Sequence, residues 1–182
     1  NPNNPITNEL ESILTNTPGG IIRSKNAKSK FEILYSSHED SMFIERYKIQ
    51  FRPDPASLLS EFISDKSNKP LAISLTGEFI SAYVNGPPKL DDGSDPEKNP
   101  YHLKGTNNGN ILIFADTDIL SNSIWTQKQD NFGKEVFTPI ADNGSLVINS
   151  VEFLSGGGEL IALRTRGTSN RPFIVVEELH KQ

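Results

Sequence analysis

Short, continuous apolar runs alternate with helical patterns along the chain, and this alternation limits the possible folds more than any other feature. Each run has the length of a strand that is buried on both faces. The runs are residues 31–35, 71–75, 111–114, 160–163 and 173–176. Strands and helices in alternation predict an α/β fold with a mostly parallel sheet flanked by helices.

Two helices are expected between these runs. In residues 54–64, Asp54 is a natural N-cap and Pro55 suits the first helical position. In residues 143–158, apolar side chains recur at helical spacing, and three glycines follow that favour a left-handed C-cap. The apolar face expected for this second helix is Leu146, Val147, Val151 and Leu154.

The length and composition of the chain indicate a single domain over residues 1–182. With 35% apolar and 23% charged residues, the chain has the composition of an ordinary globular protein. Residues 85–110 differ, because they are rich in proline, glycine, asparagine and charge. We expect an exposed loop there, which is either a lip over a binding site or an insertion without function.

Charge and residue usage exclude several functions. The net charge of −5 and the scattered basic residues argue against a nucleic-acid partner. The chain has no cysteine, so cysteine nucleophiles, disulfides and thiolate zinc sites are excluded. Its three histidines, His38, His102 and His180, lie in a polar turn, in a long loop and at the carboxyl terminus, so no obvious base is buried beside a nucleophile for a serine-histidine-acid triad. We therefore expect no cofactor and no catalytic residues.

Two aspartates directly follow the third apolar run. Asp116 and Asp118, with Ser121 and Ser123, offer oxygen ligands for a hard cation at the end of a strand. Alternatively, the same residues cap the helix that follows. A haloacid-dehalogenase phosphatase motif would require Thr or Val in place of Leu120. The candidate ligand-binding residues at this turn are Asp116, Asp118 and Ser121, and no metal ligands are assigned.

Trp125, the single tryptophan, is the fourth candidate ligand-binding residue. Its ring can stack on a sugar, but an aromatic side chain in a helical run is more often packed against the protein. Both interpretations stay open from the sequence.

Four blocks together resemble the gliding-motility-type ABC-transporter auxiliary family. They are NPIT at 4–7, PLAISLTGEFISAY at 70–83, ILIFADTDILS at 111–121 and INSVEFLSGGGELIALRTR at 148–166. The resemblance implies a fold similar to flavodoxin and to class I glutamine amidotransferases. It also implies that the chain is the carboxyl-terminal part of a larger domain.

The resemblance further implies a function outside catalysis. Amidotransferase-like enzymes use a cysteine nucleophile, which is missing here, so the fold would serve as a binding or scaffold module. The expected partners are the membrane and ATPase subunits of an ABC transporter, and a glycan or secreted polymer. The expected location is the periplasmic side of a bacterial cytoplasmic membrane, with a membrane helix flanking this chain. The alternatives are a metal-assisted hydrolase or glycan-processing enzyme using Asp116 and Asp118, and an oligomerisation domain.

Overall fold

The computed structural model describes residues 1–94, 103–131 and 133–156 of the 182-residue chain. Its strands are β1 (Lys30–Ser36), β2 (Pro70–Ile80), β3 (Gly105–Phe114), β4 (Thr126–Asn131) and β5 (Lys134–Pro139). Its helices are α1 (Arg46–Gln50), α2 (Pro55–Ser60), α3 (Asn122–Trp125) and α4 (Asn143–Leu154). The first three predicted strands are therefore confirmed as strands, whereas the runs at 160–163 and 173–176 lie outside the described residues.

The prediction of a mostly parallel sheet flanked by helices, of flavodoxin or amidotransferase type, is wrong. The main sheet has the order β1-β2-β3, and both of its pairings are antiparallel. Strands β4 and β5 form a separate antiparallel pair. Continuous apolar runs indicate a sheet with two apolar faces, but they carry no information about strand direction.

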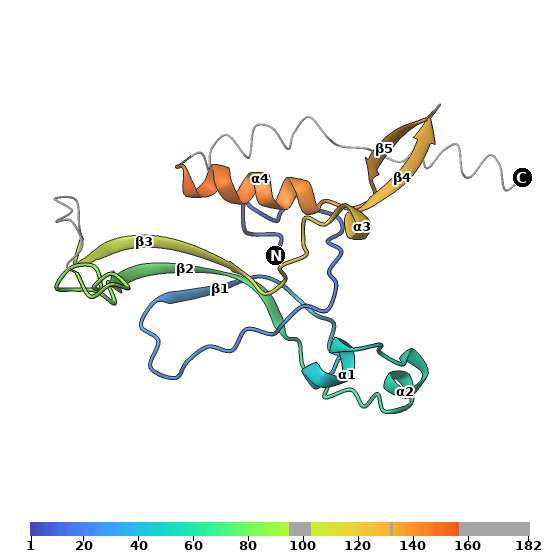
Figure 1. Cartoon of the computed structure of the whole chain (residues 1–182), viewed down its shortest axis with the longest axis horizontal. Helices are drawn as coiled ribbons and strands as arrows, with labels where there is room; N and C mark the ends of the chain where they lie inside the picture. Colours follow the sequence, from blue (N-terminus) through green and yellow to red (C-terminus); the bar gives the residue numbers. More distant parts are fainter. Residues whose placement is uncertain (95–102, 132, 157–182) are drawn as a thin grey trace, which may run out of the picture.

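The connections between strands explain the difference. The segment from β1 to β2 contains α1 and α2, but neither helix has a buried residue, and both lie to one side of the sheet (Figure 1). They do not form the crossover that a parallel pair requires. Strand β3 begins at Gly105, so the last part of the expected loop 85–110 belongs to a strand that pairs with β2.

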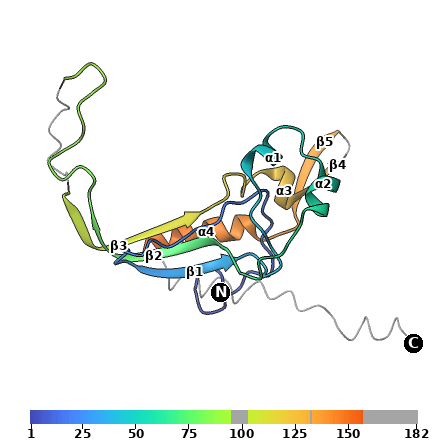
Figure 2. The same cartoon turned by 90° about the horizontal axis from the view of Figure 1, so that it is seen from below.

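The core lies between one face of this sheet and α4. Figures 1 and 2 show α4 lying along a single face of β1-β2-β3. The fully or largely buried apolar residues of this layer are Ile6, Leu34, Ala72, Ile119 and Leu146. On the opposite face of the sheet, the strand pairing aligns apolar side chains of β1, β2 and β3 in two rows. Of these side chains, Ile33, Ile111 and Ile113 remain partly exposed.

The N-terminal segment is held in this layer by buried asparagines. Asn149 of α4 donates its side-chain amide to the carbonyl of Ile6 at 3.1 Å. Asn143, which is fully buried, bonds both the N–H and the carbonyl of Leu14, at 3.0 and 2.7 Å, and also the carbonyl of Ile119. Residues 1–20 contain no helix or strand, so these amides satisfy backbone groups that would otherwise be buried alone.

Both expected helices exist, with changed boundaries or faces. The Asp54 side chain accepts a hydrogen bond from the N–H of Ala56 at 3.1 Å, which confirms the predicted cap of α2. Helix α4 ends before Gly156, whose φ of 84° is the left-handed conformation expected there. However, α4 buries Asn149 and Ser150, while Val151 is exposed. The helix is thus rotated relative to the apolar face predicted for it.

Candidate functional site

Asp116 occupies the turn after β3, and both of its carboxylate oxygens accept backbone hydrogen bonds. One oxygen accepts from the N–H of Asp118 at 2.9 Å, which closes the turn locally. The other accepts from the N–H of Asn16 at 3.0 Å, which ties the N-terminal segment to the sheet. The side chain is buried. Its observed role is therefore to cap a turn and to anchor a distant segment.

The other residues of this turn do not converge on a common point with Asp116. Asp118 is exposed, and its carbonyl accepts from the N–H of Ser121 at 2.7 Å. The hydroxyls of Ser121 and Ser123 bond to each other at 2.9 Å, and Ser121 makes no side-chain cap bond to α3. Throughout the described ranges, no group of three His, Cys, Asp or Glu side chains is placed to hold a metal ion.

Trp125 packs against the start of α4. A Cβ placed on Gly144 would lie 3.0 Å from the Trp125 ring, so the indole rests on the glycine backbone. The indole N–H is buried and has no hydrogen-bond partner among the described residues. This arrangement fits the packing interpretation of Trp125, since a ring covered by a helix has little surface left for a sugar.

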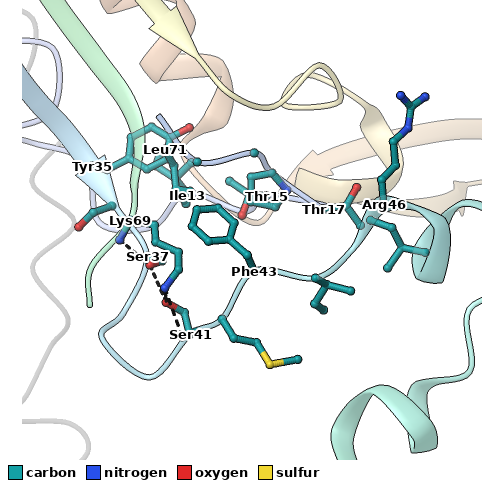
Figure 3. Close-up of a pocket in the computed structure, with 17 residues that line it drawn as sticks. Ile13, Thr15, Thr17, Tyr35, Ser37, Ser41, Phe43, Arg46, Lys69 and Leu71 are labelled. Carbon is teal, nitrogen blue, oxygen red and sulfur yellow. Dashed lines mark hydrogen bonds between the residues drawn. The ribbon is translucent and has the colours of Figure 1, made fainter. Parts of the chain in front are cut away.

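The structure contains a second candidate site, which is a pocket of about 620 Å³ beside the Asp116 turn. Its walls come from three segments that are far apart in the sequence (Figure 3). These are residues 13–20, residues 41–49, and the adjoining ends of β1 and β2 with Lys69 before β2. Apolar side chains predominate in the lining, and hydroxyls provide most of its polar groups. The hydroxyl-bearing residues are Thr15, Thr17, Tyr35, Ser36, Ser37 and Ser41.

The wall formed by residues 13–20 is fixed to the sheet by the turn after β3. The N–H of Gly19 donates to the carbonyl of Ala115 at 2.6 Å, and the N–H of Asn16 donates to Asp116. Thr15 and Thr17 flank Asn16 and line the pocket. Asp116 therefore positions one wall of this pocket without lining it.

The wall formed by residues 41–49 is fixed by Lys69, whose side chain is largely buried. Its ammonium donates to the Ser41 carbonyl at 3.2 Å and to the Asp65 carboxylate at 2.6 Å. The same ammonium lies 5.3 Å from the centroid of the Phe43 ring. The bond from Lys69, followed by bonds from Ser67, lowers the pKa of Asp65. Lys69 thus holds residues 41–43 against the floor of the pocket.

Tyr35 forms part of the floor and has a buried hydroxyl without a hydrogen-bond partner among the described residues. Burial, and then the nearby Asp116 carboxylate, raises the pKa of Tyr35 to about 12. The hydroxyl is therefore protonated, and a donor, at neutral pH. A buried donor without a partner is costly, so this hydroxyl lowers the stability of the fold.

Sequence reasoning did not find this pocket. In the sequence Tyr35 is only the last residue of an apolar run, and no pattern there marks Lys69. The sequence contains one indirect indication of the pocket. Asp116 is a predicted ligand-binding residue, and in the structure it anchors one wall of the pocket through Asn16.

We expect Asp116→Ala to lower the free energy of unfolding by about 1 to 2 kcal/mol, because two backbone N–H groups lose their acceptor. Asp118→Ala is the matched control and should cost less than about 0.5 kcal/mol, because its carboxylate is exposed. Chemical denaturation with and without magnesium measures both effects. A gain of several degrees in Tm on adding magnesium, lost in either variant, would show a cation site instead.

Comparison with known proteins gives one match. A family model described as an ABC-type uncharacterized transport system matches residues 1–150. No curated protein and no solved structure matches the chain. Among the described residues, no helix has the length and apolar character needed to span a bilayer.

Proposed function

The chain belongs to the ABC-type uncharacterized transport system family, and from this membership we propose that it is a non-catalytic binding module of the transporter's auxiliary component. The family implies association with the other components of a transport system. The membrane and ATPase subunits are the partners we propose for the module. Its task would be to hold a molecule that the transporter moves, or one that signals to it.

The observation that carries this proposal is the pocket, with the ring of Phe43 and several hydroxyl-bearing residues in its lining. Small-molecule sites are usually concave, mostly apolar, and supplied with a few placed polar groups. This pocket is likewise concave and mostly apolar, with a few polar groups. Hydrogen bonds of Asp116 hold one of its walls in place, and hydrogen bonds of Lys69 hold the other. A preformed, anchored pocket costs little entropy when it binds a ligand.

The lining indicates the kind of ligand. The ammonium of Lys69 is already engaged by Asp65 and Ser41, so it offers little unpaired charge to an anion. Arg46 also lines the pocket, but its guanidinium extends away from Phe43 and Ser41 (Figure 3). The remaining polar groups are mainly hydroxyls, next to the exposed ring of Phe43. Hydroxyls and an aromatic ring suit a neutral ligand that has both hydrogen-bonding and apolar surfaces. A glycan or another secreted polymer has such surfaces, and we propose this class.

We place the module on the periplasmic side of a bacterial cytoplasmic membrane. This part of the proposal is supported only by the sequence resemblance of the four blocks to the auxiliary family. Protease digestion of spheroplasts that express the full-length protein tests it. Cleavage of the domain in intact spheroplasts is expected, and complete protection until lysis would place the domain on the other side.

We expect Thr15→Val to weaken the binding of a pocket ligand about three- to tenfold, since Thr15 lines the pocket and one hydrogen bond is worth about 0.5 to 1.5 kcal/mol. The same change should alter the free energy of unfolding by less than about 0.5 kcal/mol, because Thr15 is only partly buried. Isothermal titration calorimetry with neutral gluco-, manno- and chito-oligosaccharides measures the binding. Denaturation of the unliganded variant measures the stability.

Tyr83→Phe is the control for this test, because Tyr83 is exposed and outside the pocket lining. It should change neither binding nor stability. Saturable binding that neither change affects would place the ligand elsewhere on the molecule.

A further inference from the structure

The connection between β1 and β2 carries an unusual amount of exposed apolar surface. Within α1, α2 and the residues that follow them, Tyr47, Phe51, Leu59 and Ile63 are between 69% and 80% exposed. Neither helix buries any residue. Tyr47 is in the first turn of α1, and Phe51 directly follows the last residue of this short helix with an extended backbone. Large exposed apolar patches on a soluble domain mark a surface that meets an apolar partner.

Among the charged side chains of this connection, Arg46, Arg52 and Glu45 form no ion pair within the described residues. Residues 43–63 contain three basic and three acidic residues, in a chain whose net charge is −5. Lys48 is paired with Glu61, and Asp54 caps α2. Within the part of the chain that the structure describes, Arg46 and Arg52 have no acidic partner. Both stand next to an exposed aromatic residue, Tyr47 or Phe51.

We propose that this surface, defined by Tyr47, Phe51, Leu59 and Ile63 with Arg46 and Arg52, rests on the headgroup region of a lipid bilayer. Aromatic and aliphatic side chains enter the boundary between headgroups and acyl chains, and arginines beside them contact lipid phosphates. The charge arrangement favours this partner, because the two arginines without an ion pair stand next to exposed aromatic side chains and outnumber Glu45, so they complement an anionic lipid surface. Membership of a membrane transport family supplies such a surface.

The lipid-facing surface is continuous with the pocket. Phe43, Ile44, Arg46 and Ile49 line the pocket and precede or belong to the same stretch of chain. A domain resting on lipid through α1 would therefore bring the mouth of its pocket near the membrane. The lipid contact itself does not depend on what the pocket binds, so it can fail or succeed independently of the proposed ligand.

Vesicle cosedimentation of the 182-residue chain tests the proposal. Wild type is expected to bind vesicles of phosphatidylcholine with phosphatidylglycerol, and to bind pure phosphatidylcholine more weakly. The double variant Tyr47→Ser, Phe51→Ser should lose on the order of tenfold in binding to both vesicle types. The double variant Arg46→Gln, Arg52→Gln should lose about fivefold per arginine, only on anionic vesicles and less at high salt.

The control is Ile148→Ser with Val151→Ser, which removes two exposed apolar side chains from α4 at a distance from this surface. It should bind vesicles like the wild type. Equal loss in the control would show non-specific apolar adsorption and overturn the proposal. No vesicle binding by the wild type would also overturn it. Dimerisation that Tyr47→Ser, Phe51→Ser abolishes, without any vesicle binding, would identify a second copy as the occupant instead.

Discussion

Asn143→Ala is expected to lower the free energy of unfolding by about 3 kcal/mol, because each buried backbone group that loses its partner costs about 1 to 3 kcal/mol. The Asn143 amide serves three such groups. It accepts from the N–H of Leu14 at 3.0 Å and donates to the carbonyls of Leu14 and Ile119 at 2.7 and 2.8 Å. Alanine replaces none of these bonds, and the Asn143 side chain that it truncates is fully buried. Urea denaturation measures the loss.

Asn122→Ala is the matched control, because Asn122 is exposed at the start of α3. This substitution should lower the free energy of unfolding by less than about 0.5 kcal/mol. Asn143→Asp gives a sharper test. It keeps the size of the side chain but turns the amide that donates to two carbonyls into an acceptor, so it should be at least as destabilising as alanine. If Asn143→Asp were as stable as the wild type, the amide would not be oriented toward those carbonyls.

The positions of the first three strands and of α4 could be predicted, because they depend on local patterns. Apolar runs mark β1, β2 and β3 wherever their partners lie. Asp54 and Gly156 mark helix ends through the conformations that their own side chain, or lack of one, permits. Such signals survive in one sequence because each involves residues only a few positions apart.

Strand direction could not be predicted in the same way. The helical pattern at 54–64 suggested a crossover over the sheet, yet Leu59 and Ile63 point into solvent. The pattern of apolar residues in a helix does not show which element the helix packs against. Here the side chains of Leu59 and Ile63 are largely exposed. The hairpin of β4 and β5 was missed for the opposite reason, because its strands are almost wholly exposed and polar in pattern.

The pocket and the N-terminal segment depend on contacts between residues far apart in the chain. Asn16 meets Asp116 across 100 positions, and Asn143 meets Leu14 across 129. An asparagine in a helix is usually read as facing solvent, so Asn143 and Asn149 gave no sign that they bind buried backbone. Asp116, at the end of the third apolar run, did indicate the region of the pocket. Its observed hydrogen bonds, however, position a wall of the pocket and do not bind a ligand.

Leu146→Ala is expected to lower the free energy of unfolding by about 2 to 5 kcal/mol, the range for removing a buried leucine side chain from a core. Leu146 is fully buried between α4 and the sheet, where it belongs to one cluster with Ile6 and Leu34. The truncation leaves a cavity, because strands β1 and β2 hold the opposite wall in place through their pairing. Thermal and urea denaturation of the variant give the size of the effect.

Val151→Ala provides the comparison that decides how α4 is oriented. The sequence pattern places Val151 on the same buried face as Leu146, whereas in the structure Val151 is exposed and Asn149 and Ser150 are buried. The structure therefore predicts a loss below about 1 kcal/mol for Val151→Ala, since little apolar area returns to water. Losses of similar size at Leu146 and Val151 would mean that α4 turns its apolar stripe inward in solution. The asparagine contacts to residues 6 and 14 would then be broken as well.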